Sequence, residues 1–214
     1  MINILDLSQE ITNQLDGLKY SKDPHTFSKV DIISEKEWKA ILPEPPKNTS
    51  KSTKDELIEI SKLTASRTKS DLDWIMMIDD KVESIFIPEL NKLNLKYPKS
   101  TVDKLWNVYY DIVTNIKLYF NRARCWQLAP RYGITIDAII SDSSKTPSYP
   151  SGHSAYGYLL ENILSDMYPI HKTLFASLAE RVGLARKMQG VHYDSDVLAA
   201  KKLTNIVYPK LKTL

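Results

Sequence analysis

Apolar residues recur at steps of three and four along most of this chain, which is the spacing of a helix with one buried face. The clearest run lies between Val102 and Phe120, and Thr101 is its predicted N-cap. We find no segment with the strict alternation of a half-buried strand. The pattern therefore predicts an all-α fold.

Further helices are predicted from their start and stop signals. Capping-box spacing, with Glu three residues after Ser or Thr, opens a short helix at Ser34 and a longer one from Thr53 to about Ser66. Apolar periodicity ended by Pro169, Gly190 or Pro209 marks most of the remaining helices. These remaining predicted helices span residues 71–86, 151–167, 170–187 and 193–208.

Two segments break the helical pattern. Residues 42–54 hold three prolines followed by polar residues, which is typical of an extended connector. Residues 128–149 mix proline, glycine and serine and should form a long irregular loop, a kind of loop that is often functional. Neither reads as a domain linker, so we expect one helical bundle, with residues 1–40 as a helical extension of the domain formed by residues 41–214.

Composition narrows the class of protein. Of the 214 residues, 43% are hydrophobic, and 29 cationic residues stand against 26 acidic ones, spread evenly along the chain. This favours a packed globular domain and argues against a nucleic-acid-binding stripe. No apolar run approaches the roughly 18 to 20 residues of a membrane span. With no secretory pattern at the start and only Cys125, the expected location is the cytoplasm.

Three short blocks carry the residues that phosphate chemistry needs. In the first block, Lys117 and Arg124 are seven positions apart, so on one continuous helix they would share a face and point into one pocket. Long charged side chains at a helix end also simply reach into solvent. That second interpretation is the one we give to Arg122 and Arg131 nearby.

The second block is the turn from Pro150 through Ser151 and Gly152 to His153. Ser151 can cap the following helix, whose free N–H groups then bind an anion. His153 would lie in the first helical turn, within reach of a leaving-group oxygen. Taken alone, the same four residues also fit an ordinary capped helix start.

The third block joins Arg186 to His192 and Asp196. Four residues separate His192 from Asp196, so the two side chains can meet on one helical face. A carboxylate on one ring nitrogen fixes the tautomer and leaves the other nitrogen free to attack. Arg186 can clamp a phosphate with its planar fork. A structural His–Asp pair is the alternative, and Asp194 should be a solvated residue.

In order and spacing, the three blocks resemble the signature of the phosphatidic acid phosphatase type 2 and vanadium haloperoxidase superfamily. Residues 149–155 and 190–200 are most similar to the bacterial class A non-specific acid phosphatases, and the likeness covers roughly residues 40–208. The resemblance implies an all-α bundle of that type. It also implies a metal-independent phosphomonoester hydrolase, or a phosphotransferase of the same chemistry, acting on a small soluble phosphate ester.

The resemblance also implies residue roles. His192 would be the nucleophile that forms a phosphohistidine, Asp196 would orient it, and His153 would protonate the leaving alcohol and then activate water. The phosphate ligands implied are Lys117, Arg124, Ser151, Gly152 and Arg186. No cofactor is implied, vanadate is expected to inhibit, and some helical relatives form homo-oligomers.

Two positions depart from the family pattern. Cys125 stands where the family has proline, and Ala185 stands where it has serine. Neither position supplies a phosphate ligand in this scheme. We therefore expect changes in local rigidity or supporting bonds, with the chemistry kept.

Four alternatives remain open from the sequence. A vanadate-dependent haloperoxidase would use the same pocket with vanadate as its cofactor. A hydrolase triad of Ser151, His192 and Asp196 would lack the usual Gly-x-Ser-x-Gly elbow and leave the cations unexplained. Metal binding by His153, His192, Asp194 and Asp196 would likewise leave the arginines without a role. The fourth alternative is a helical binding or structural protein with an inactive site.

Overall fold

The computed structural model describes residues 9, 12–22 and 32–214, and within these ranges the chain forms helices and no β-strand. An isolated bridge pairs Lys19 with Arg122. The α-helices are α2 (Glu35–Ile41), α3 (Lys51–Ala65), α4 (Lys69–Asp80), α5 (Ile87–Lys92), α6 (Lys99–Phe120), α7 (Cys125–Leu128), α8 (Gly152–Met167), α9 (Lys172–Met188) and α10 (Asp194–Leu211). The prediction of an all-α fold is confirmed. Much of the predicted extension over residues 1–40 lies outside the described residues.

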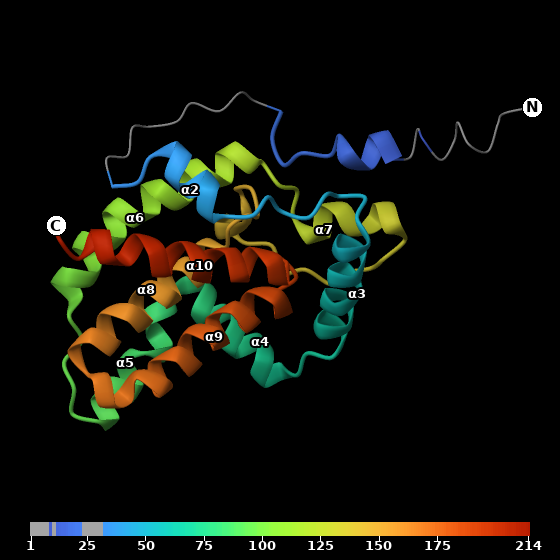
Figure 1. Ribbon diagram of the computed structural model, residues 1–214. Coiled ribbons are helices and arrows are strands. Elements are labelled where there is room, and N and C mark those ends of the chain that lie inside the picture. The colour runs from blue at the N-terminus through green and yellow to red at the C-terminus, as the bar shows by residue number, and fades with distance from the viewer. Residues whose placement is uncertain (1–8, 10–11, 23–31) are drawn as a thin grey trace, which may run out of the picture.

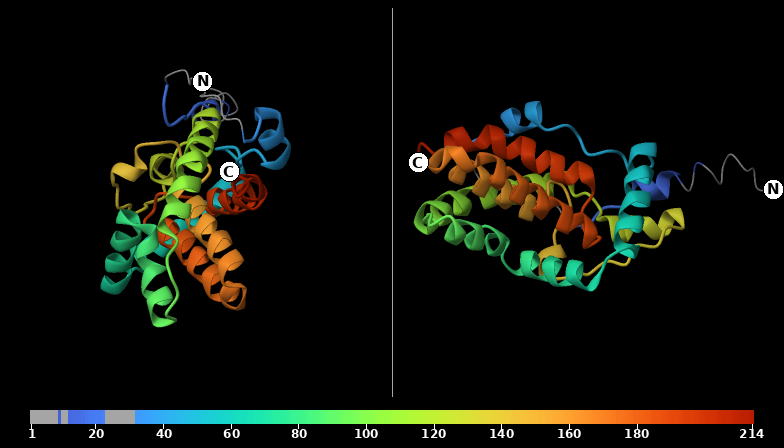
Figure 2. Two further views of the ribbon diagram at one scale, coloured as in Figure 1. Left: turned by 90° about the vertical axis from the view of Figure 1, so that its left-hand side faces the viewer. Right: turned by 90° about the horizontal axis from the view of Figure 1, so that it is seen from below.

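Helix α8 is at the centre of the bundle. It packs against α9 and α10 along most of its length and also against α6. In Figure 1 and in the right-hand view of Figure 2, α8, α9 and α10 run side by side. Helix α3 lies at the edge of this group, near α7, and contacts α9. The first turns of α8 and α10 both carry residues of the predicted site.

Two glycines let α9 approach its neighbours closely. A Cβ atom added to Gly183 would lie 2.6 Å from a methyl carbon of Val197 in α10, so any larger residue must push the helices apart. A Cβ atom on Gly157 in α8 would lie 3.2 Å from Val182 in α9. These contacts fix the spacing of the helices that carry the third block of the sequence.

The buried apolar residues form two clusters. The larger one joins α4, α6, α8, α9 and α10 and includes the fully buried Ile75, Tyr158 and Phe175. The smaller one lies between α3 and α7, where Leu57 and Cys125 pack near Tyr193. Because Tyr193 immediately precedes α10, the smaller cluster supports the start of that helix.

Several helix starts agree with the sequence prediction, and others correct it. Ser34 caps α2 in a capping box with Glu37, as predicted. Ser151 caps α8, as predicted. The prediction of Thr53 as a cap is wrong, because α3 starts earlier, at Lys51, and Ser50 accepts the backbone N–H of Thr53. Helix α6 likewise begins at Lys99, so Thr101 is inside the helix rather than at its cap.

The predicted helix over residues 71–86 is in fact two elements. Helix α4 ends at Asp80, Lys81 adopts an extended backbone, and a 3-10 helix, η1, follows over Val82–Ile85. Pro209 was expected to end the last helix, but it lies inside α10. This break directly follows Asp79 and Asp80, two residues that reach the site described below.

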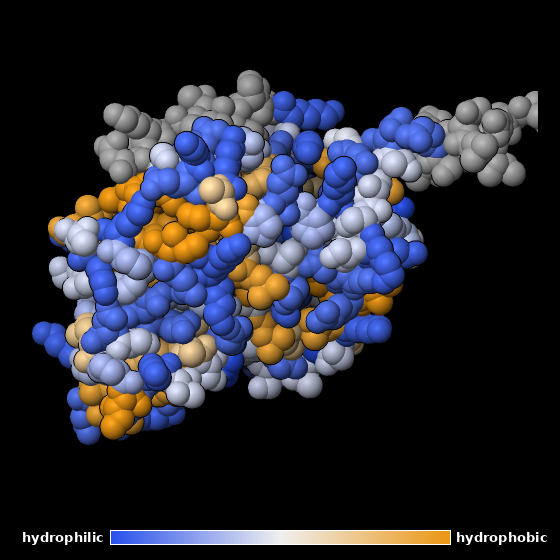
Figure 3. Space-filling view, viewed as in Figure 1, coloured by the Kyte–Doolittle hydropathy of each residue, from blue (hydrophilic) through white to orange (hydrophobic). Residues whose placement is uncertain are grey.

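The irregular stretch over residues 128–149 is present as predicted, interrupted by the 3-10 helices η2 (Ala129–Tyr132) and η3 (Asp142–Ser144). The surface is mixed, with separate hydrophobic patches among hydrophilic residues on the face seen in Figure 3. None of the helices in the described ranges is long and apolar enough to cross a membrane.

Candidate active site

Residues from the three sequence blocks meet at one end of the bundle. His192 lies just before α10, and Asp196 is in the first turn of that helix. The Nδ1 atom of His192 is 3.0 Å from Oδ2 of Asp196, and the same oxygen accepts the backbone N–H of Tyr193 at 3.0 Å. The pair forms because the helix start bends Asp196 back over His192. The spacing had predicted that the two residues share one helical face. That prediction is wrong, because His192 lies before the helix.

The other ring nitrogen of His192 faces a cation. Nε2 lies 3.2 Å from a guanidinium nitrogen of Arg124. An arginine can only donate and a carboxylate can only accept, so the neutral ring carries its proton on Nδ1, toward Asp196. Its lone pair is on Nε2, beside Arg124. His192 is 1% exposed, yet it lines the cavity described below.

Arg122 completes the support of Asp196. It is 4% exposed, and it donates to Oδ1 of Asp196 at 2.6 Å and to the Ser195 hydroxyl at 2.8 Å. Its guanidinium carbon lies 3.8 Å from the centre of the Tyr193 ring, and Glu56 is 3.4 Å away. The prediction that Arg122 reaches into solvent is therefore wrong. The same prediction was made for Arg131, and it agrees with the exposure of that side chain.

Lys117 and Arg124 both line the site, although they do not lie on one helix. Helix α6 ends at Phe120, and Asn121 takes a left-handed conformation (φ 46°) that turns the chain. Lys117 Nζ donates to the backbone oxygen of Pro147 at 2.7 Å. Arg124 donates to the backbone oxygens of Thr146 at 2.8 Å and Val191 at 3.0 Å. Through these bonds, the irregular loop and the segment that leads into α10 hold both side chains in place.

The turn of the second block connects α8 to α10. The backbone N–H of Ser151 donates to the backbone oxygen of Asp196 at 3.1 Å, and its hydroxyl accepts from Ser154. Gly152 is the first residue of α8, and a Cβ atom there would only touch Lys117. The free N–H groups of this helix start are thus next to Lys117, as an anion site requires.

His153 faces the cavity from the first turn of α8. Its Nε2 lies 3.2 Å from the backbone oxygen of Asp79, at the end of α4. A carbonyl oxygen can only accept, so Nε2 carries a proton and Nδ1 is the nitrogen left for other partners. The side chain is about 20% exposed. Asp79 thus orients His153 through its main chain.

Arg186 is completely buried behind the cavity wall. Its guanidinium contacts the Asp79 carboxylate and Gln189, and it donates to the Ser143 hydroxyl at 3.0 Å. Ser143 lines the cavity and Arg186 does not. Direct phosphate binding by Arg186 therefore stays a prediction.

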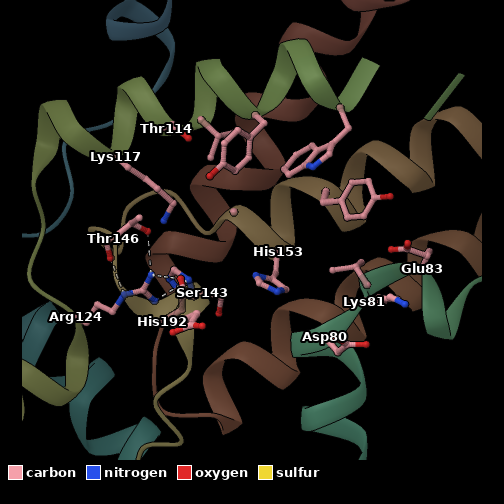
Figure 4. A pocket seen from close by; sticks show the side chains of 17 residues that line it. Asp80, Lys81, Glu83, Thr114, Lys117, Arg124, Ser143, Thr146, His153 and His192 are labelled. Atoms are coloured by element: carbon pink, nitrogen blue, oxygen red, sulfur yellow. Dashed lines mark hydrogen bonds between the residues drawn. The ribbon is translucent and has the colours of Figure 1, made fainter. Parts of the chain in front are cut away.

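The cavity between these residues measures about 460 Å³. Figure 4 shows Lys117 pointing down from α6 toward Arg124 and His192, with His153 on the opposite side and Lys81 and Glu83 beyond it. Of the predicted site residues, those lining the cavity are Lys117, Arg124, Gly152, His153 and His192. Ser151, Arg186 and Asp196 support them from behind.

Burial and clustered cations shift the pKa values of the site. Burial, reinforced by the charge of Arg124, holds the pKa of Lys117 well below its usual value. Burial and Arg124 also place the pKa of His192 well below that of a free histidine. Burial and Arg186 lower the pKa of His153 to about 3. Both imidazoles are therefore neutral near pH 7.

Asp196 behaves in the opposite way. Burial acts to raise its pKa, but the charge of Arg122 and the hydrogen bond to His192 outweigh burial and hold the pKa well below the usual range. The carboxylate is thus ionised near neutral and at mildly acid pH. An ionised Asp196 keeps the Nδ1 proton of His192 in place.

The supporting residues Asp79, Ser143, Arg122 and Glu56 had not been predicted. Only Arg122 had a local signal, because it lies two residues before Arg124 and two residues after the end of α6. The remaining three reach the site from α3, α4 and a loop that are distant in the sequence. Spacing within a short block cannot reveal such contacts.

Two alternative sites fit the geometry less well. The hydrogen bonds of the Ser151 hydroxyl go to Ser154, and His192 presents Nε2 to Arg124, so no Ser–His–Asp relay forms. In the described part of the chain, no group of three or more His, Cys, Asp or Glu side chains could hold a metal ion. Asp194 instead pairs with Lys187 at 2.7 Å, at 44% exposure, so it is not simply solvated.

The two residues that depart from the family pattern, Cys125 and Ala185, both lie among the residues that support the site. Cys125 is fully buried, and its thiol donates to the backbone oxygen of Gly190 at 2.8 Å. Burial raises the pKa of this thiol to about 12. Ala185 is also buried, one residue before Arg186. Cys125 thus connects the chain after Arg124 to the turn before His192.

Comparisons with known proteins identify a similar family and similar relatives. Residues 108–203 match the family described as the PAP2 superfamily. A non-specific acid phosphatase of Salmonella typhimurium is 29% identical over 144 residues, which cover 63% of this chain and 56% of that protein. A non-specific acid phosphatase of Providencia stuartii is 38% identical over 58 residues, covering 27% of this chain and 23% of the relative. The chain thus spans little more than half the length of the Salmonella relative.

A solved structure shares the fold. The transmembrane PAP2 type phosphatidylglycerolphosphate phosphatase from Bacillus subtilis superposes with a TM-score of 0.53 at 17% identity, over 77% of this chain and 87% of that one. The matched region, residues 108–203, runs from α6 to α10 and contains all the predicted site residues. Through this region, the chain is similar to the PAP2 superfamily.

Proposed function

We propose that this chain is a phosphomonoester hydrolase of the acid phosphatase type, which transfers the phosphoryl group to His192 and then to water. The observation that carries the proposal is the orientation of His192. Its Nδ1 proton is held by Asp196 at 3.0 Å, and its Nε2 lone pair faces the cavity beside Arg124. A nitrogen nucleophile requires a neutral imidazole with a fixed tautomer and a lone pair directed at the substrate. The Arg124 N–H that contacts this lone pair would turn to the phosphoryl oxygens when the substrate binds.

In the first step, Nε2 of His192 attacks phosphorus and forms a P–N bond while the ester P–O bond breaks. His153 donates a proton to the departing alcohol oxygen. In the second step, a water molecule attacks phosphorus, His153 takes one proton from it, and the P–N bond breaks to release inorganic phosphate. Both steps need the two histidines on opposite sides of the phosphoryl group, and Figure 4 shows His153 across the cavity from His192.

The cations and the helix start would hold the phosphoryl oxygens. Lys117 and Arg124 line the cavity, and the free N–H groups at Gly152 add neutral donors. Preorganised donors of this kind stabilise the charge that spreads over the equatorial oxygens in the transition state. Arg186 adds positive charge from behind Ser143. This donor set assigns no role to a metal ion, and vanadate should bind as an inhibitor.

The proton on His153 must come from somewhere, because its pKa of about 3 leaves the free enzyme's imidazole neutral. A bound phosphate ester brings negative charge beside the ring and raises the pKa of His153 toward its usual range. A monoanionic ester can also bring the proton with it. The scheme therefore favours turnover at mildly acid pH, as the names of the relatives from Salmonella and Providencia suggest.

Hydrolysis of 4-nitrophenyl phosphate tests the proposal. We expect turnover that vanadate blocks, that a metal chelator leaves intact, and that His192→Ala abolishes. His171→Ala, outside the cavity, is the matched histidine control. Turnover that depends on a metal would contradict the proposal, as would the oxidation of bromide by peroxide with added vanadate in place of hydrolysis.

A further inference from the structure

The cavity is larger than a phosphoryl group needs, and its lining has two parts of different character. Its volume of about 460 Å³ is within the range of roughly 300 to 1,000 Å³ that is typical of small-molecule sites. Lys117 and Arg124 lie at the phosphoryl end. Another part of the lining is a set of residues that we call the aromatic wall, namely Trp106, Tyr110, Val113 and Tyr156.

Helix α6 carries most of this wall on the face that also carries Lys117. Val113, Tyr110 and Trp106 precede Lys117 by 4, 7 and 11 residues, close to whole helical turns. At a rise of about 1.5 Å per residue, they lie roughly 6, 10 and 16 Å along the helix from the lysine. The wall therefore extends away from the phosphoryl end over a length that suits one ring system.

Helix α8 closes the wall beside the acid. Tyr156 is one turn after His153, and its ring packs against Trp106 with centroids 4.6 Å apart at 35°. Trp106 also contacts Tyr110 edge-to-face at 5.7 Å. Tyr110 is 52% exposed and Trp106 is half-buried, so ring surface is accessible from the cavity.

The position of the wall indicates which part of a substrate it contacts. In the proposed mechanism His153 protonates the leaving oxygen, so the leaving alcohol lies on the His153 side, against the wall. Aromatic side chains favour stacked or edge-to-face contact with another ring. The charged residues Asp80, Lys81 and Glu83 also line the cavity, on the far side of His153 from Lys117 and Arg124 (Figure 4). A long acyl chain on the leaving alcohol would meet these charges, whereas a compact ring can lie against the wall alone.

We propose that the aromatic wall is a binding subsite for a flat aromatic ring carried by the leaving alcohol of the phosphomonoester. This inference rests on the proposed function, because it places the leaving group beside His153. The ring could belong to a simple aryl-alkyl alcohol or to the base of a nucleotide. Both would use the same stacking surface.

Ester pairs with similar leaving alcohols test the subsite. We expect kcat/KM for 2-phenylethyl phosphate to exceed that for ethyl phosphate by about 10- to 100-fold, the value expected for burying one ring. It should also exceed that for 2-cyclohexylethyl phosphate, which has similar bulk without an aromatic face. Adenosine 5′-phosphate against ribose 5-phosphate shows whether a nucleobase gains as much as a phenyl ring. Equal rates within the phenyl, cyclohexyl and ethyl series would overturn the inference.

Substitutions in the aromatic wall test which residues cause the preference for the phenyl ester. Trp106→Leu and Tyr110→Leu should each lower the preference for the phenyl ester several-fold and leave inhibition by inorganic phosphate unchanged. Tyr119→Leu, a half-exposed tyrosine on the same helix but outside the cavity, should keep the full preference. A preference that survives in both wall variants, with the fold intact by circular dichroism, would overturn the assignment.

Binding separates failure of the subsite from failure of the proposed function. Phenylphosphonate and methylphosphonate are not hydrolysed, and calorimetric titration measures their affinity without turnover. Tighter binding of phenylphosphonate, reduced in Trp106→Leu, supports the subsite even if no ester is hydrolysed. Equal affinity in an enzyme that does hydrolyse 4-nitrophenyl phosphate overturns the subsite alone.

Discussion

At the scale of single residues, the site depends on a carboxylate that serves two partners. Asp196 gives one oxygen to His192 and the other to Arg122. A buried carboxylate with a single partner tends to gain a proton, because burial disfavours its charge. Arg122 prevents this and so keeps the Nε2 lone pair of His192 available. Arg122 is thus a positioning residue that does not itself line the cavity.

Replacing Arg122 by lysine is expected to lower kcat and leave KM nearly unchanged. Lysine keeps the charge but loses the planar fork that reaches Asp196 and Ser195 together. A hydrogen bond to a charged group contributes about 1.5 to 3 kcal/mol, so we expect a loss of about 10- to 100-fold in kcat for 4-nitrophenyl phosphate. Steady-state kinetics measures both constants.

The exposed Arg131 provides the control for this substitution. Arg131→Lys should behave like the unmodified protein. If Arg122→Lys raised KM as strongly as it lowered kcat, Arg122 would be contacting the substrate directly. An unchanged kcat would remove Arg122 from the account of the site.

At the scale of helices, the apolar periodicity predicted where most elements lie but not how they end. The long helix before Phe120 and the capped start at Ser151 both followed from local signals. Lys117 and Arg124 were assigned to one helical face because the spacing alone does not show that Asn121 turns the chain. A left-handed residue depends on contacts such as the bonds between Asn121 and Ser21, 100 residues away in sequence.

The residues that support the cavity lining could not be predicted from local sequence patterns, for the same reason. Asp79 reaches His153 and Arg186 from the last turn of α4, across 74 and 107 positions of sequence. Glu56 reaches Ser195 across 139 positions of sequence. The predicted residues that line the cavity share short blocks, while most of those that hold them come from separate helices. Sequence reasoning could therefore identify the first group and not the second.

At the scale of the whole molecule, two neutral histidines are held close to Lys117, Arg124 and Arg186. A free histidine has a pKa near 6.5, whereas burial and cations lower the pKa of both His153 and His192 in the folded chain. The unfolded chain therefore binds more protons below about pH 6.5. Each histidine contributes stability that is present above that pH and is lost as the pH falls toward the folded value.

We therefore expect the free energy of unfolding to fall between about pH 6.5 and pH 4.5, by up to about 1.4 kcal/mol per pH unit for each histidine. Urea denaturation at a series of pH values measures this slope. His153→Gln should reduce the slope over that range, and His171→Gln, outside the cavity, should not. An unchanged slope in His153→Gln would mean that this imidazole is not buried in its neutral form.

The most direct test of the central claim is detection of the phosphoryl group on His192. His153→Ala should still form the intermediate from 4-nitrophenyl phosphate, because a good leaving group needs little acid, but should hydrolyse it slowly. Rapid quenching in base, which preserves phosphohistidine, followed by peptide mass spectrometry should find one phosphoryl group on the peptide that contains His192. A phosphoryl group on another residue, or none on His192 during continuing turnover, would contradict the account.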